Sequence, residues 1–318
     1  MISSSANPQP PFGPTEKVEI VVCSWNRSSL LKKTLDSIRR LIVPYQVQLR
    51  VILVDNGSTD DTPAVMSQFA DDETFTKRHQ VLLLTEAQQG HTHARNKAVA
   101  HLESDLVIWT DDDVLLDAFL VQRYVEFADA NPGTAFFGGQ IKPDFEVTPD
   151  DWITENWEQL KGCFAERDLG DEATAFTSDR LPYGANFAVR GPVQKEFPFD
   201  AELGRRGQQV LGEDELEMMR RVLADGYHGS WVPDAKVLHF IDRTRMTEIW
   251  VRDYFVGQGR ALVAKGEAWS DSASRLKWRS LLKFMAYRFK RQFAPSKQWV
   301  SLMLESSLAA GQAMELTK

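Results

Sequence analysis

Residues 106–113 read Leu-Val-Ile-Trp-Thr-Asp-Asp-Asp, an apolar run that ends in three acids. A short aliphatic run of this kind is typical of a strand buried inside a parallel sheet. Similar runs, each followed by polar residues, occur at 18–23 and 49–54. Two further strands are expected at 81–84 and 134–137, and helical periodicity occurs at 28–41, 60–69, 93–102 and 115–130. Strands that alternate with helices predict an α/β fold with a mostly parallel sheet flanked by helices.

The second half of the chain predicts an irregular region followed by helices. Residues 140–182 contain Pro143, Pro149 and Pro182 in a polar and aromatic mixture, which is typical of a functional loop region. Beyond it we expect a helix over 211–224, a short strand over 236–240, and a helical pattern from 246 with a break at Pro295. The expected organisation is a disordered lead-in over 1–15, a main domain over 16–245 and a C-terminal helical extension over 246–318.

The composition of the 318-residue chain is that of a globular protein, with 43% hydrophobic and 26% charged residues. The net charge of −8 argues against a nucleic-acid partner. Cys23 and Cys163 are too few for a disulfide scaffold or a cysteine zinc site, and they fit a reducing compartment. The N-terminus lacks a signal-peptide pattern and no apolar run is long enough to span a membrane, so we expect a cytoplasmic location.

Basic residues are concentrated near the C-terminus. Between Ser272 and Leu304 there are eight Lys and Arg residues and no Asp or Glu, although the whole chain is acidic. On a helical projection one face collects Trp278, Leu281, Leu282, Met285, Phe289 and Phe293. Such a helix suits the surface of an anionic membrane, which would make the protein peripheral on the cytoplasmic face. The alternative is that the apolar face packs on the main domain, and the sequence leaves both open.

Polar residues follow three of the predicted strands, at 24–27, 55–58 and 110–113. In an open α/β sheet these strand ends meet at one edge, where ligands bind. Alternate side chains of an extended chain share a face, so Asp111 and Asp113 are expected to point together and Asp112 away. Two close carboxylates suit Mg²⁺ or Mn²⁺, completed by the phosphates of a ligand. The alternative is a solvated turn or a helix N-cap.

Five stretches, in this order, resemble glycosyltransferase family 2, whose members have the nucleotide-sugar-binding GT-A fold. They read IVVCSWNR from Ile20, VILVDNGSTD from Val51, GHTHARN from Gly90, WTDDD from Trp109 and GEDEL from Gly212. The resemblance implies a Rossmann-like GT-A domain and an inverting, metal-dependent glycosyltransferase. It would move a sugar from a nucleoside diphosphate, with UDP favoured over GDP and dTDP, to a hydroxyl of a glycan or lipid-linked acceptor, as in polysaccharide and cell-envelope biosynthesis.

The resemblance assigns the first group of residues to the donor. Ser24, Asn26 and Arg27 would surround the nucleotide. Asp55 would bind the base or ribose, although an Asx-turn is the alternative reading. Arg95 would face the diphosphate, for which a guanidinium fork is well suited, and the alternative is a surface arginine.

Within the acidic stretch, the resemblance makes Asp113 the main metal ligand and has Asp111 touch ribose or metal, while Asp112 is grouped with the donor-binding residues. His239 would complete the Mn²⁺ or Mg²⁺ site, since an imidazole can ligate Mn²⁺. A structural histidine is equally open at this position.

The transfer itself needs a base, because the acceptor hydroxyl loses its proton as it attacks the anomeric carbon. The resemblance assigns this role to Asp214 and gives Glu213 a supporting role at the acceptor. Asn186 would hydrogen-bond the sugar, with a turn asparagine as the alternative. Two other functions compete: a nucleotidyltransferase, which would want a glycine-rich loop that 24–29 lacks, and a non-catalytic binding protein with the same fold.

Overall fold

The computed structural model describes residues 11–201, 214–264, 266 and 271–317, which form two compact units. Of these residues, the first unit contains 11–142, 167–201 and 214–239. The second contains 143–166 and the described residues from 240 onward. The structure therefore groups part of the predicted loop region with the C-terminal helices, whereas the sequence suggested one boundary at 245.

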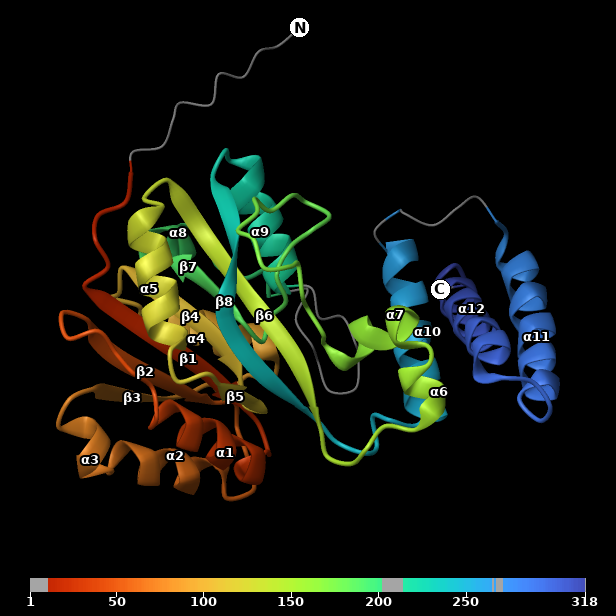
Figure 1. The fold of residues 1–318 in the computed structure, drawn as a ribbon, viewed down its shortest axis with the longest axis horizontal. Coiled ribbons are helices and arrows are strands. Elements are labelled where there is room, and N and C mark those ends of the chain that lie inside the picture. The colour runs from red at the N-terminus through yellow and green to blue at the C-terminus, as the bar shows by residue number, and fades with distance from the viewer. Residues whose placement is uncertain (1–10, 202–213, 265, 267–270, 318) are drawn as a thin grey trace, which may run out of the picture. The chain divides into compact units, whose positions relative to one another are not determined.

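The first unit is built on an eight-stranded sheet in the order β3-β2-β1-β4-β7-β6-β8-β5 (Figure 1). The strands are β1 (Lys17–Ser24), β2 (Gln48–Asp55), β3 (Gln80–Thr85), β4 (Leu106–Asp111), β5 (Val114–Leu116), β6 (Thr134–Phe145), β7 (Phe187–Arg190) and β8 (His228–Ile241). Strands β1 to β4 pair in parallel. Strand β7 is antiparallel to both β4 and β6, and β5 is antiparallel to β8, so the sheet is mixed.

Helices cover both faces of this sheet because its central strands are apolar on both sides. In β1, Ile20 and Val22 enter one core, while Val21 enters the core on the other face. The first core is covered by α1 (Ser28–Ile38), α2 (Thr62–Ala70) and α5 (Leu120–Ala130). The second is covered by α4 (His91–Val99), α8 (Gly191–Glu196) and α9 (Asp214–Ala224). Each large apolar side chain buried in these layers contributes about 1.5–3 kcal/mol.

The second unit is helical and has an aromatic core. Its elements are α6 (Asp151–Thr154), α7 (Trp157–Leu160), a 3₁₀ turn (Lys161–Phe164), α10 (Glu248–Ala264), α11 (Ala273–Lys290) and α12 (Ser296–Glu315). Phe164 and Trp299 lie in one buried cluster that joins the short helices to the long ones. α10 and α12 cross closely, since a Cβ on Gly311 would lie 2.0 Å from the carbonyl oxygen of Val256. None of the described helices is long and apolar enough to cross a bilayer.

The predicted α/β class, the helices on the sheet and the C-terminal helices are confirmed. One predicted helix, 115–130, is wrong in its first turn: residues 114–116 form β5, and α5 begins at Leu120. Asp113 therefore precedes a strand and is not a helix N-cap. The predicted strand 236–240 is the end of the longer β8, and the short α3 (Glu73–Thr76) follows α2.

Candidate active site

Three strand ends meet at one edge of the sheet, as the sequence predicts. In the parallel register Ser24 of β1 lies beside Asp55 of β2, and Cys23 lies beside Asp111 of β4. The acidic stretch 111–113 is therefore adjacent to the loop that follows β1. Burial raises the pKa of the Cys23 thiol to about 12, so this cysteine is no nucleophile at the edge.

Asp111, Asp113 and His239 converge on one point. Each offers a ligand atom, and these atoms lie within 4.8 Å of one another. His239 arrives there because β5 pairs with β8, which places Val114 opposite His239. Asp113 Oδ1 is buried and accepts no hydrogen bond from the described residues. The distance from this oxygen to His239 Nε2 is 3.3 Å. Two carboxylates and an imidazole form a donor set that suits Mn²⁺ or Mg²⁺, so the residues fit the divalent cation that the resemblance implies.

Asp112 makes a different set of contacts, as the predicted alternation requires. Its Oδ2 accepts a 2.6 Å hydrogen bond from Ser24 Oγ. Its Oδ1 accepts from Arg27 Nη1 at 3.1 Å, and the same nitrogen donates to Asp113 Oδ2 at 2.7 Å. Burial, opposed by Arg27, raises the pKa of Asp112 to about 7. Ser24 and Arg27 thus hold the acidic stretch in place, and the Arg27 side chain is still 47% exposed toward solvent.

A second acidic cluster surrounds Arg95 of α4. Its Nη1 donates to Asp214 Oδ2 at 2.9 Å and to Glu215 Oε2 at 3.1 Å, both at the start of α9. Its Nη2 lies 4.0 Å from Asp111 Oδ1. The guanidinium is 3% exposed and packs 5.1 Å from the centre of the Phe199 ring. The alternative of a surface arginine is therefore wrong, and Arg95 links the acids of α9 to those of β4.

Arg95 separates the pKa values of its two acidic partners. Burial favours a neutral Asp214, but the charges of Arg95 and His91 outweigh burial, and the pKa of Asp214 falls below its usual range. Burial, opposed by Arg95 and reinforced by the neighbouring Asp214, raises the pKa of Glu215 to about 7. Asp214 is the charged member of the pair near neutral pH, and a charged carboxylate can accept a proton.

Gly184, two residues before Asn186, packs directly against this cluster. A Cβ at this position would lie 2.8 Å from Glu215 Oε1 and 3.0 Å from Arg95 Nη2. A larger residue at this position would therefore displace the side chains of Glu215 and Arg95. Glycine here allows the chain after 182 to approach the buried ion pair closely.

Several predicted site residues have structural contacts instead. Asn186 is fully buried: its Oδ1 accepts from Tyr124 and its Nδ2 donates to the carbonyls of Gln140 and Ala235, so we do not retain it as a sugar ligand. Asp55 accepts from the backbone N–H of Ser58, three residues on, at 3.1 Å, so its carboxylate closes the turn after β2; its role at the base or ribose stays a prediction.

Asn26 connects two loops of the same edge. Its backbone has φ of 53°, and its Oδ1 accepts from the N–H of Thr59 at 2.7 Å. The side chain thus fixes the loop after β1 to the turn after β2. Glu213 lies outside the described residues.

Glu215, Thr92 and Gly184 lie in or beside stretches that the sequence singles out, but none of them was given a role of its own. Thr92 Oγ1 donates to Asp214 Oδ2 at 3.4 Å, from the first turn of α4. The only available signal was three successive acids at a helix start, which ordinarily serve as dipole complements. Their contact with Arg95 spans more than a hundred residues of sequence and leaves no local pattern.

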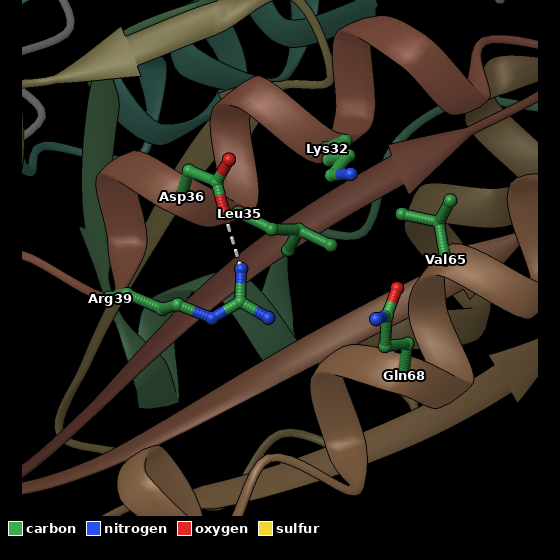
Figure 2. A pocket seen from close by; sticks show the side chains of 6 residues that line it. All are labelled: Lys32, Leu35, Asp36, Arg39, Val65 and Gln68. Carbon is green, nitrogen blue, oxygen red and sulfur yellow. Dashed lines mark hydrogen bonds and ion pairs between the residues drawn. The ribbon is translucent and has the colours of Figure 1, made fainter.

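A separate cavity of about 220 Å³ lies between α1 and α2 (Figure 2). Leu35 and Val65 line its apolar part, and the ion pair between Asp36 and Arg39, 2.6 Å long, borders it. None of the residues that line it belongs to the acidic edge. This cavity is therefore distinct from the candidate active site.

Comparison with known proteins gives a consistent result. The family model "Glycosyl transferase family 2" matches residues 19–182. Glycosyltransferase GlyA of Streptococcus pneumoniae is 22% identical over 95% of this chain and 39% of its own length. Succinoglycan biosynthesis protein ExoM of Rhizobium meliloti is 23% identical over 80% of each chain. The chain thus spans well under half of GlyA, although it spans most of ExoM.

Solved structures share the fold. The mannosyltransferase PcManGT from Pyrobaculum calidifontis, in complex with GDP-Man and Mn²⁺, has a TM-score of 0.61 at 17% identity, covering 96% of this chain and 89% of that one. S. aureus TarS 1–349 in complex with UDP has a TM-score of 0.54 at 13% identity, covering 95% and 90%. The family model covers more than half of the chain and the fold agrees with it, so the chain belongs to glycosyltransferase family 2.

Proposed function

We propose that the chain transfers a sugar from a nucleoside diphosphate, with UDP favoured, to a hydroxyl of a glycan or lipid-linked acceptor, with inversion at the anomeric carbon. The observation that carries the proposal is the meeting of two clusters at one sheet edge. One is Asp111, Asp113 and His239, and the other is Asp214 and Glu215 around Arg95. The first is suited to a cation and a diphosphate, and the second to proton transfer.

The acceptor class is supported by names among the relatives. One is an undecaprenyl-phosphate 4-deoxy-4-formamido-L-arabinose transferase of Klebsiella pneumoniae, 27% identical over 37% of this chain. Another is a teichoic acid poly(glycerol phosphate) polymerase of Staphylococcus epidermidis, 28% identical over 35% of this chain. These names point to lipid-linked and cell-envelope glycans as the first acceptors to test.

For the donor, Asp111, Asp113 and His239 would hold a divalent cation, Mn²⁺ or Mg²⁺. Such a cation stabilises the charge that develops on a diphosphate leaving group. Arg27 reaches the same carboxylates from the loop after β1, and its half-exposed guanidinium can turn to a phosphate without unfolding that loop. Arg27 is thus the residue of the edge best placed to contact the diphosphate directly.

For the acceptor, we assign the base to Asp214. The hydroxyl proton passes to a carboxylate oxygen of Asp214 as the hydroxyl oxygen bonds to the anomeric carbon, and the nucleoside diphosphate leaves from the opposite face. Arg95 acts as a positioning residue, since its bond to Asp214 Oδ2 holds the carboxylate charged and oriented. Glu215 shares that guanidinium and, with its raised pKa, stays partly protonated near neutral pH.

A donor screen with and without metal tests the proposal. The full chain is incubated with UDP-, GDP- and dTDP-sugars in Mn²⁺, in Mg²⁺ or in EDTA, and nucleotide release and sugar transfer to a lipid-linked acceptor are measured. We expect metal-dependent turnover that Asp113→Ala and Asp214→Asn abolish. Asp225→Asn, an exposed acid just after the same helix, serves as the control and is expected to keep full activity.

Two results would contradict parts of the proposal. Near-normal turnover of Asp214→Asn would remove the base assignment, and NMR of a product that retains the anomeric configuration would exclude inversion. Nucleotide-sugar binding without turnover under every condition would instead support the non-catalytic alternative.

A further inference from the structure

Helix α11 carries large apolar side chains on its solvent-exposed surface. Trp278, Met285 and Phe289 are 66%, 60% and 70% exposed, and Phe293 just beyond the helix is 77% exposed. Leu281 and Leu282 are also exposed and lie between them along the chain. We call these six residues the α11 stripe. The helix has 18 residues and is about 27 Å long, and the stripe runs from its second turn to just beyond its end.

The α11 stripe lies opposite the face with which the helix is anchored. With about 100° per residue, Met285 and Phe289 lie within about 20° of Trp278 around the helix. Leu276 and Tyr287, which are buried, lie on the far side. There Ser280 and Ser306 of α12 exchange hydrogen bonds of 2.9 and 3.0 Å. The stripe is therefore not the edge of the core of the second unit.

Basic side chains border the stripe on both sides. Lys277 and Arg288 lie along one edge of it and Lys290 along the other, and all three are exposed. They form no ion pair with any residue that the structure describes. The cations that point toward the second unit are different, because Lys283 pairs with Glu305 and Arg291 pairs with Glu248. On the stripe side, Arg275 and Arg279 pair with Asp271. The charges of Lys277, Arg288 and Lys290 are therefore the ones beside the stripe that no described acid compensates.

We propose that the α11 stripe and its basic borders bind the surface of an anionic lipid bilayer, with the helix lying in the plane of the interface. A helix that exposes aromatic and aliphatic side chains over about a third of its circumference, with cations on both edges, has the chemistry of such a surface. A second copy of the chain fits poorly, because a symmetric contact would bring the uncompensated cations of both copies together. The inference stands independently of the transfer reaction.

Vesicle binding of the full chain tests it, with no donor or acceptor present. Co-sedimentation is compared on phosphatidylcholine vesicles and on vesicles with phosphatidylglycerol added. A charge variant, Lys277→Gln with Arg288→Gln and Lys290→Gln, is expected to lower the affinity for anionic vesicles by about 100-fold, since each basic residue near such a surface contributes about fivefold. Three exposed lysines of the first unit give its matched control, Lys17→Gln with Lys32→Gln and Lys195→Gln, which is expected to bind normally.

An apolar variant, Trp278→Ser with Phe289→Ser, separates the stripe from its charges and is expected to lower the affinity by roughly tenfold or more. Its control is Tyr45→Ser, which removes a fully exposed aromatic side chain from the first unit. Equal binding to neutral and anionic vesicles, or unchanged binding of the apolar variant, would overturn the proposal. So would light scattering that shows the unaltered chain self-associated through the stripe and not bound to vesicles, because the partner would then be a second copy.

Discussion

Replacing Arg95 by Met removes the cation that lies between the buried Asp214 and the largely buried Glu215. Arg95 and Asp214 are 3% and 1% exposed, and the bond between Arg95 Nη1 and Asp214 Oδ2 is 2.9 Å long. Methionine retains an unbranched side chain that can pack against Phe199, but it carries no charge. The variant therefore leaves Asp214 and Glu215 buried without their counter-ion, in an otherwise similar packing arrangement.

We expect Arg95→Met to lower the free energy of unfolding by about 3–5 kcal/mol at pH 8, the range for breaking a buried ion pair by removing one partner. The loss depends on pH. Without Arg95, burial raises the folded-state pKa of Asp214 above its unfolded value of about 3.9, so the folded protein holds a proton that the unfolded chain releases. The destabilisation is then complete above the raised pKa and fades as the pH falls toward about 4.

Urea unfolding at pH 8 and pH 5 measures this loss. Arg123→Met is the matched control, because the pair between Arg123 and Glu126 is about half exposed and 3.4 Å long, and such pairs contribute about 0–1 kcal/mol. A loss for Arg95→Met no larger than that of Arg123→Met would refute the reasoning. An equal loss at both pH values would refute it as well, because compensation of buried carboxylates must depend on their ionisation.

Three further predictions concern the same edge. Gly184→Ala places a Cβ 2.8 Å from Glu215 Oε1, and we expect kcat to fall at least tenfold in steady-state assays, while Gly133→Ala, where the new Cβ meets no atom, is neutral. Glu215→Gln fixes this side chain in the neutral form, which the raised pKa of Glu215 favours. As the pH rises from about 4.5 to 7, the unaltered protein should become less stable in thermal unfolding, and the variant should not show this decline. Arg27→Met removes the positive charge that lies next to Asp113 Oδ2, so Mn²⁺ should bind about tenfold more tightly in calorimetry without nucleotide. An unchanged affinity for Mn²⁺ would show that Arg27 does not compete with the cation.

The parallel half of the sheet could be predicted from the sequence because its strands are buried on both faces. In β1 both Ile20 and Val21 are fully buried, so an uninterrupted aliphatic run marks the strand. β5 and most of β8 could not be found this way. β5 has three residues, and its pairing with β8 joins segments more than a hundred residues apart. β8 alternates buried and exposed residues and includes Pro233 and Asp234, which local propensity assigns to turns.

The types of residue at the site were predictable, but their partners were not. Asp111, Asp113 and His239 converge as expected, because strand order places them together. Arg95 was expected beside the diphosphate and the aspartate stretch. The structure places it near Asp111 but also buries it against Asp214, which was not expected, since α4 and α9 cover the same face of the sheet. Asn186 illustrates the opposite error: its amide faces backbone carbonyls that only the folded sheet supplies.

The charge distribution at the edge gives a reason for a divalent cation that does not depend on the resemblance. Among the residues that the structure describes, the ion pairs of Asp111, Asp112, Asp113, Asp214 and Glu215 with arginine involve Arg27 and Arg95. Arg95 is engaged by the acids of α9, and Arg27 by Asp112 and one oxygen of Asp113. The remaining oxygen of Asp113, beside Asp111 and His239, accepts no hydrogen bond from the described residues. A diphosphate arriving there alone would add further negative charge, so we expect donor affinity to depend on a divalent cation that binds with it or before it.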